Sequence, residues 1–260
     1  AASDVYKRQG IGGSAKVSLR GIRSASGDNQ PLYVIDGVPM LNIGTEQAYS
    51  AIGGTANAGN RDGGDGISNL NPEDVESISI LKGAPAAALY GSQAANGVIL
   101  ITTKKGNTAG QRNIYFSTGL TFDKAFSLPK MQNCYGVSDV VDSWGEKAYL
   151  PTSNELNDFF RTGLTSITSV SVNYGNEKIQ TYFSYANTTG RGIVDKNQLT
   201  KHNINLRETA VMFNQRLKLD GNVNVMRQIV KNKPVSGGFY MNPLVGLYRF
   251  PRGEDLSYYK

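Results

Sequence analysis

The feature that most limits how this chain can fold is a change of hydrophobic period near residue 113. From there to about residue 230, segments of about ten residues alternate between apolar and polar side chains, which is the period of a β-strand. The residues that share the apolar face are Ile114, Phe116, Thr118, Leu120 and Phe122, then Val170, Val172 and Tyr174, then Ile179, Thr181, Phe183 and Tyr185, then Ile204 and Leu206, and finally Leu217, Leu219, Val223 and Val225. The opposite face is charged and rich in amides, as a wet lumen needs. Such segments are typical of β-barrel strands in a membrane.

The connections between these segments alternate in length. Tight links fall at residues 175–177 and 213–215, whereas longer links are predicted at 126–164, at 188–199 and after Val230. Short periplasmic turns and long external loops alternate in the same way in membrane barrels. Alternating strands also build soluble sandwiches, so the periodicity by itself leaves a soluble β-rich module open.

Before residue 106 the apolar residues come in short continuous runs, which predicts a different kind of domain. The predicted elements are, in chain order, a strand at 32–35, a hairpin turn at Asp36-Gly37, a strand at 76–82, a short helix at 84–90 that ends at Gly91, and a strand at 97–103. Strand, helix and strand in this order predict a small mixed α+β domain.

Two stretches stand outside this pattern. Residues 1–9 lack the pattern of a signal peptide, and we predict that they are a non-native leader. Residues 53–66 are rich in glycine and are predicted to form a mobile loop.

Composition excludes several classes of function. The formal net charge is +6, but Lys and Arg are scattered, without a basic run or an aromatic motif that would hold bases, so nucleic acid is not a predicted partner. Cys134 is the only cysteine, which excludes an internal disulfide and a CxxC-type metal cluster. The longest purely aliphatic stretch is residues 98–101, far shorter than the roughly 20 residues of a membrane helix.

The acid–base residues predict no catalytic site, so the chain is not expected to be an enzyme. His202 is the only histidine and is predicted to be a lumen or surface residue, because nucleophilic triads have no other base to use. Glu73-Asp74 and Glu254-Asp255 could suggest a glycosidase pair, but adjacent side chains on an extended strand point apart. We predict that both pairs are solvated turn acids.

No cofactor or metal site is predicted either. Asn60, Asp62 and Asp65 lack the spacing and the closing Glu of a calcium loop, and no Gly-Lys-Ser/Thr follows the glycines to make a phosphate loop. Trp144 and Tyr149 lie in the long first connection, where they could stack on a sugar ring, although loop packing is the commoner role of such aromatics. Substrate-binding residues are therefore unknown from the sequence.

Ordered motifs in both halves resemble the SusC/RagA-type family of TonB-dependent outer-membrane transporters. The plug-like motifs are VSLRG at 17–21, PLYVIDGVP at 31–39, LNPEDVESI at 70–78, LKGA at 81–84, AAALYGS at 86–92 and AANGVILITTKKG at 94–106. NPL at 242–244 and LYRFPRGED at 247–255 are similar to an early-barrel segment of the same family. Gly83 and Pro85 depart from the family pattern, which more often has Asp and Ser there.

The resemblance implies an α+β plug domain at 10–106, followed at 107–260 by antiparallel β-strands of an incomplete transmembrane β-barrel. It implies a location in the outer membrane of a Gram-negative cell and active import of glycans or peptides. The implied partners are the TonB complex, reached through an N-terminal segment missing from this chain, a SusD-like surface lipoprotein, outer-membrane lipid and the substrate. A siderophore or vitamin receptor of the same fold, and a soluble β-rich carbohydrate-binding module, are the alternatives.

Overall fold

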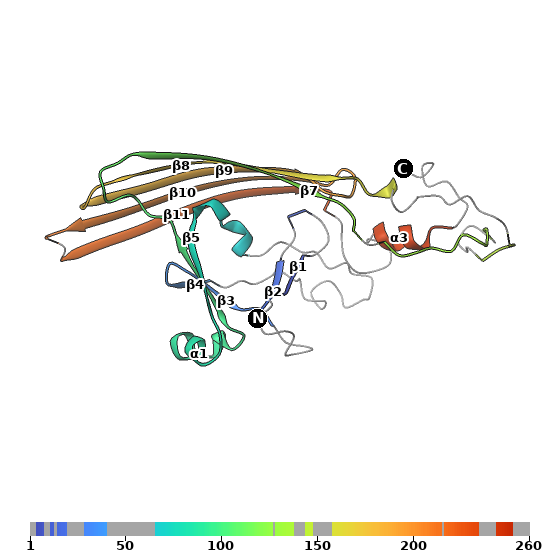
Figure 1. Ribbon diagram of the computed structural model, residues 1–260, viewed down its shortest axis with the longest axis horizontal. Coiled ribbons are helices and arrows are strands. Elements are labelled where there is room, and N and C mark those ends of the chain that lie inside the picture. The colour runs from blue at the N-terminus through green and yellow to red at the C-terminus, as the bar shows by residue number, and fades with distance from the viewer. Residues whose placement is uncertain are drawn as a thin grey trace.

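A computed structural model describes residues 4–7, 11–12, 15–19, 29–40, 66–126, 128–137, 144–147, 158–214, 216–233 and 243–251, and every structural statement below concerns these residues. Their strands form three sheets: a small mixed sheet, a long antiparallel sheet that lies across it, and a separate two-stranded pair (Figure 1).

The small sheet has four strands and belongs to what we call the small domain, the described residues from 11 to 106. The strands lie in the order β4 (Val38–Met40), β3 (Leu32–Ile35), β6 (Val98–Thr103) and β5 (Val75–Leu81). β3 and β6 are parallel, and the two outer strands are antiparallel to their neighbours. Short helices join the strands: η1 (Ile67–Asn69), η2 (Pro72–Asp74), α1 (Ala84–Tyr90) and η3 (Gly91–Ala94). The predicted strands, hairpin and helix are confirmed.

The two central strands of the small sheet are buried on both faces. On one face Leu19, Tyr33, Ile99 and Ile101 form an apolar cluster, and on the other face Val34, Val98, Ala86 and Ala94 form a second. Small alanines let α1 and η3 pack close to the sheet. Burial on both faces explains why these strands read as continuous apolar runs rather than as alternating ones.

Gly37 and Gly97 are two of the small-domain glycines whose positive φ favours glycine. In the β3–β4 hairpin, Asp36 has φ 50° and Gly37 has φ 85°, the left-handed pair of a type I′ turn. At Gly97, φ is 99° and an added Cβ would lie 2.9 Å from Leu19 Cδ1, so both conformation and space exclude a side chain. The turn aims the Asp36 carboxyl toward the long sheet.

The long sheet contains five antiparallel strands. They are β7 (Asn113–Asp123), β8 (Gly163–Gly175), β9 (Ile179–Arg191), β10 (Gln198–Met212) and β11 (Leu217–Lys231), each paired with its neighbour in the chain. All five strands predicted from alternation are confirmed. Residues 176–178 and 213–216 form the tight links at one end of the sheet, as predicted, and residues 124–162 form the long first connection.

The predicted long link at 188–199 is wrong. β9 continues to Arg191 and β10 begins at Gln198, so only residues 192–197 connect them. Residues near this end are polar on both faces and therefore lack the apolar alternation on which the prediction rested. The ladder of backbone hydrogen bonds nevertheless continues, with Arg191 opposite Gln198.

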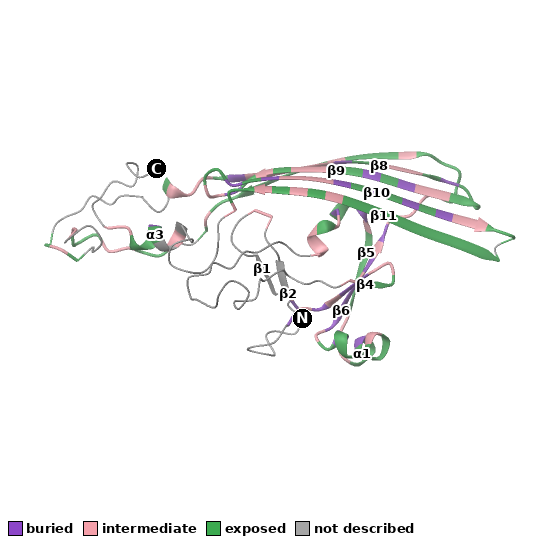
Figure 2. Ribbon diagram, turned by 180° about the vertical axis from the view of Figure 1, so that it is seen from behind, coloured by how far each residue is buried: buried purple, intermediate pink, exposed green. Residues whose placement is uncertain are grey.

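Burial in the long sheet is the reverse of that in a water-soluble sheet (Figure 2). On β9, Tyr182 and Ser184 are buried, whereas Phe183 and Tyr185 point outward and are exposed. On β7, Phe116 is 68% exposed and Leu120 is 62% exposed. A contiguous apolar face of this size marks a surface that contacts something other than water.

The remaining described elements are small. β1 (Asp4–Lys7) pairs with β2 (Ala15–Ser18), so part of the stretch that the sequence analysis set aside as a leader has strand structure. A helix, α3 (Pro243–Arg249), which the sequence analysis did not predict, follows the long sheet. None of the helices in the described ranges has the length and apolarity needed to cross a membrane.

Candidate functional site between the small domain and the long sheet

Four successive inward positions of β10 hold the small domain. Because side chains alternate along a strand, Lys201, Asn203, Asn205 and Arg207 all point to the same face. Each donates a hydrogen bond to the small domain. Lys201 Nζ donates to the Ser68 carbonyl, and Asn203 Nδ2 donates to the Asn69 carbonyl at 2.6 Å. Asn205 Nδ2 donates to Asp74 Oδ2 at 3.4 Å, and an Arg207 Nη donates to Asp36 Oδ2 at 2.9 Å. One strand thus contacts both the η1–η2 segment and the β3–β4 turn.

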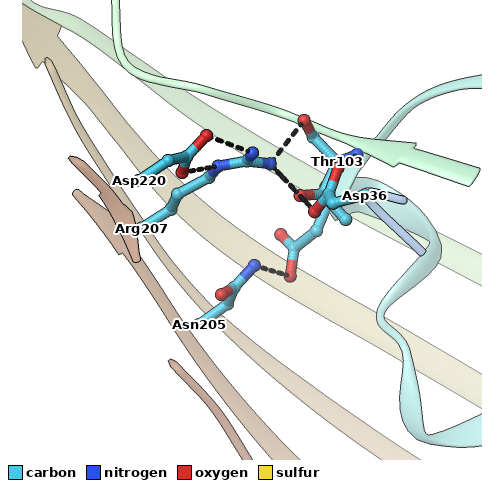
Figure 3. A network of polar contacts seen from close by, with 6 residues as sticks. Asp36, Thr103, Asn205, Arg207 and Asp220 are labelled. Carbon is cyan, nitrogen blue, oxygen red and sulfur yellow. Dashed lines mark hydrogen bonds and ion pairs between the residues drawn. The ribbon is translucent and has the colours of Figure 1, made fainter. Parts of the chain in front are cut away.

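The strongest part of this contact surrounds Arg207 (Figure 3). Its guanidinium binds the Asp220 carboxylate of β11 through two hydrogen bonds, of 2.9 and 2.8 Å. The remaining Nη donates to Asp36 at 2.9 Å and to the Thr103 hydroxyl at 2.6 Å. The Arg207 side chain is only 5% exposed. A planar guanidinium suits this bridging role, because it presents several donors in a fixed fork.

Asp36 is held as a carboxylate from two sides. The Thr103 backbone N–H donates to one oxygen at 2.9 Å, and the Thr103 hydroxyl donates to the other at 2.6 Å. Burial raises the pKa of the Asp36 carboxyl, but the hydrogen bonds from Thr103 and the charge and hydrogen bond of Arg207 lower it by more. The net result is a pKa below the ordinary value of 3.8.

Asp74 provides a second, fully buried contact. Its carboxylate accepts from the Tyr182 hydroxyl of β9 at 3.0 Å and from Asn205 at 3.4 Å. Its backbone carbonyl accepts from Lys104 N at 2.8 Å, which fixes η2 to the end of β6. The prediction that Glu73-Asp74 are solvated turn acids is therefore wrong for Asp74, since the long sheet covers it. Glu73 is exposed, as predicted.

The contact spreads over several strands and is mainly polar, with a smaller apolar part where Gly12 lies beside Val230 and Leu199. Asn173 of β8 donates to the Lys105 carbonyl at 3.1 Å, and within the long sheet Asn224 of β11 donates to Asn203 at 3.2 Å. This amide-rich face is predicted from the sequence to line a wet lumen, whereas at these positions it binds protein. Hydrogen bonds and ion pairs can be exchanged for water when two bodies separate, so this surface can hold the small domain and still release it.

The other residues considered from the sequence do not join this site. His202, predicted to be a lumen or surface residue, lies on the outer face of β10, where Nδ1 is 2.9 Å from the Tyr185 hydroxyl. Trp144 is 70% exposed and packs against Tyr135, with ring centroids 5.6 Å apart. The candidates that lie outside the described residues are Asn60, Asp62, Asp65, Tyr149, Glu254 and Asp255. Within the described part of the chain, no three His, Cys, Asp or Glu side chains gather to hold a metal ion.

Sequence reasoning missed the residues that form the site. The alternation on β10 and β11 places Arg207 and Asp220 on the polar face, but their contact depends on register, with Arg207 opposite Asn222. The sequence predicts Asp36 only as a turn residue, and it does not show that the Asp36 carboxylate accepts a hydrogen bond from Arg207. The sequence signal for this site was a pair of opposite charges, Arg207 and Asp220, on the polar faces of two neighbouring strands.

Comparison with known proteins agrees with this arrangement. Residues 2–98 match the model of the TonB-dependent Receptor Plug Domain. TonB-dependent receptor SusC of Bacteroides thetaiotaomicron is 32% identical over 226 residues, which cover 83% of this chain and 20% of that protein. The ferrienterobactin receptor of Escherichia coli is 35% identical over 109 residues, covering 41% of this chain and 13% of the receptor.

A solved structure shares the fold. The structure of the RagAB peptide transporter superposes with a TM-score of 0.65 at 20% identity, over 88% of this chain and 28% of that one. The chain thus spans about a fifth of the length of SusC and less than a third of that structure.

A small α+β domain seated by polar contacts against an antiparallel sheet with an apolar outer face defines a plug and part of the barrel wall around it. The chain belongs to the SusC/RagA-type TonB-dependent transporters. The small domain is called the plug from here on.

Proposed function

We propose that this chain is the plug and first wall strands of an outer-membrane importer that takes up glycans or peptides and is driven by the TonB complex. The observation that carries the proposal is the row of four inward β10 side chains bound to the plug. A plug bound to the wall by many polar contacts closes the lumen at rest. A pull from the periplasm can break these contacts one after another, because each is weak by itself.

We further propose the division of the chain into a plug at 10–106 and wall strands at 107–260, and a surface lipoprotein as partner. The match of residues 2–98 to the plug-domain model supports the division, and the likeness to SusC and to the RagAB peptide transporter supports the partner. In this arrangement the tight links of the long sheet face the periplasm and the 124–162 connection faces the outside. The proposed role includes no catalytic step and no cofactor.

The substrate class can be tested by deleting the gene in its host. Growth is compared on glycans, on peptides and under iron limitation, with the wild-type gene restored as control. We expect the deletion to abolish growth on one glycan or on peptides and to leave growth on iron chelates unchanged. The lipoprotein should co-purify with the complete transporter in mild detergent.

A siderophore receptor is the second candidate function. It is favoured by the 35% identity to the ferrienterobactin receptor, which is slightly higher than the identity to SusC but covers half as much of this chain. Loss of growth only under iron limitation would support this candidate and contradict glycan or peptide import.

A further inference from the structure

The outer face of the long sheet carries a group of cations beyond the apolar band. Lys201 and Asn203 of β10 bind the plug, so the even-numbered side chains of this strand point outward. Register then places the odd-numbered residues of β9 and β11 on the same outer face. Arg191, Arg227 and Lys231 therefore all lie on the outside, and all three are exposed.

Arg191 and Lys231 lie at one level of the sheet, and Arg227 lies nearer the apolar band. Arg191 is opposite Gln198, which is opposite Lys231, so the two cations lie about 10 Å apart, two strand spacings. Arg227 lies four residues before Lys231 on the same strand, at about 13 Å. Both distances are short enough for one anionic headgroup to meet more than one flexible side chain.

Within the described residues, no carboxylate neutralises these cations. The other outward residues of β9–β11 at this level are Asn187, Thr189, Gln198, Thr200, His202 and Ile229, without a carboxylate. Asp195 in the 192–197 link forms its ion pair with Arg161 instead, at 2.8 Å. The side chains of Arg191, Arg227 and Lys231 make no ion pair with another described residue.

The level of the cations matches the edge of the apolar band. Below them, toward the tight links, the outward residues are apolar on neighbouring strands: Phe183 on β9, Ile204 and Leu206 on β10, and Val223 and Val225 on β11. Tyr185 and His202 stack at the boundary, with ring centroids 6.2 Å apart. Aromatic residues mark such boundaries in membrane barrels.

The boundary is also slanted across the sheet. Lys231, Gln198 and Arg191 lie side by side on β11, β10 and β9. The next residues in the same row are Leu164 on β8 and Phe122 on β7, and both are apolar. Strands of membrane barrels tilt by roughly 35–45°, so a row of paired residues must cross the membrane boundary. The cations therefore lie where lipid headgroups lie, on the side of the long connection.

We propose that Arg191, Arg227 and Lys231 form a binding surface for the phosphate groups of an anionic lipid in the external leaflet. The inference rests on the proposed location in the outer membrane. Charge complementarity decides the occupant: three uncompensated cations at headgroup level attract a lipid with phosphates rather than an acyl chain or a neutral headgroup. Each such cation contributes about a fivefold gain in affinity, so three contribute roughly a hundredfold.

The test uses the complete transporter in a neutral detergent, titrated with bisphosphorylated lipid A or with its dephosphorylated form and followed by native mass spectrometry. The test variant is R191Q/R227Q/K231Q. The matched control is K178Q/R216Q/K218Q, which removes three exposed cations from the opposite end of the same sheet. Thermal unfolding of each protein checks that it is folded.

We expect the wild type and the control variant to prefer the phosphorylated lipid, and the test variant to lose roughly a hundredfold in affinity for it. The preference should shrink at high salt, since screening weakens exposed charges. Equal affinity of the wild type for both lipids would overturn the inference, as would an equal loss in the control variant. The proposed function fails separately if the wild-type transporter inserts into lipid vesicles but does not import substrate. Failure to insert would overturn both.

Discussion

The plug and the long sheet are both built from β-strands, yet they bury opposite kinds of side chain. In the plug, Val34 and Val98 are almost completely buried in the core, and the buried polar residues Asp74 and Thr103 lie where the long sheet covers the plug. In the long sheet, Asn203, Asn205 and Thr209 are buried, whereas Leu206 and Val225 are exposed. The plug thus follows the rule for proteins in water, and the long sheet inverts it.

The difference teaches which solvent each region meets. An exposed apolar face is costly in water but stable in lipid, and buried amides are costly unless every one is hydrogen-bonded. The plug supplies acceptors for the Nδ2 groups of Asn203 and Asn205, namely the Asn69 carbonyl and the Asp74 carboxylate. The inner face of the wall is therefore polar because the plug covers it, and it binds the plug through the same residues.

Removing the Arg207 guanidinium should have the largest effect. R207M leaves Asp36 and Asp220 without their shared cation, and such a loss costs about 3–5 kcal/mol. We expect the plug to open more often. Hydrogen exchange of the β3 and β6 amides in the complete transporter should become roughly a hundredfold to a thousandfold faster.

The control for this prediction is K218M, which removes an exposed cation from β11 and should leave exchange in the plug unchanged. The triple variant D36N/R207M/D220N should recover part of the loss, because it removes the uncompensated charges as well. Unchanged exchange in R207M would show that the polar row does not hold the plug.

A charge on the apolar outer face should have the next largest effect. V223R places a cation among lipid tails, four residues from Arg227 toward the tight links, which costs about 2–4 kcal/mol near the middle of the bilayer. Urea unfolding from lipid vesicles measures this cost. T189R adds the same charge at an outward position beside Arg191, above the apolar band, and should be nearly neutral. Equal stability of V223R and wild type would mean that this face meets water.

Backbone strain in the hairpin should have a smaller effect. G37A forces alanine into φ 85°, which costs about 1–2 kcal/mol although there is space for the methyl group. The matched control is G221A on β11, where the added methyl also meets nothing within 4 Å and φ is ordinary. Thermal unfolding of the plug should shift downward in G37A alone; a shift of equal size in G221A would contradict the turn assignment.

Acid should produce the smallest and most specific change. The folded pKa of Asp36 is depressed, so its contribution to stability is present above 3.8 and is lost as pH falls through the lower, folded value. D36N lacks this contribution at every pH. Thermal midpoints of the two proteins should therefore converge below pH 3.8, and a constant difference at all pH values would exclude the carboxylate as the cause.

The fold follows from the sequence where one pattern decides one element. Alternation on β7 to β11, the Asp36-Gly37 turn and Gly91 at the end of α1 predict their elements correctly, because each reflects local geometry. The end of β9 was misjudged because alternation fades outside the apolar band, while backbone pairing continues to Arg191.

The candidate site could be predicted only in part. Alternation places Arg207 on the polar face, but its contact with Asp36 joins residues 171 positions apart in the chain. No local pattern encodes such a contact. The prediction for Asp74 is wrong for the same reason: its own turn is exposed at Glu73, and contact with Tyr182 and Asn205 of the long sheet covers it.

The most direct test of the account is a nitroxide scan of β11 in the complete transporter in lipid vesicles. Cys134 is exposed and must first be replaced by serine. Single cysteines at residues 222–226 are then labelled, and collisions with oxygen and with a water-soluble nickel complex are measured. We predict alternation, with high oxygen and low nickel access at Val223 and Val225, and low oxygen access at the even positions. High nickel access at Val223 and Val225 would contradict the central claim that the outer face of the wall contacts lipid.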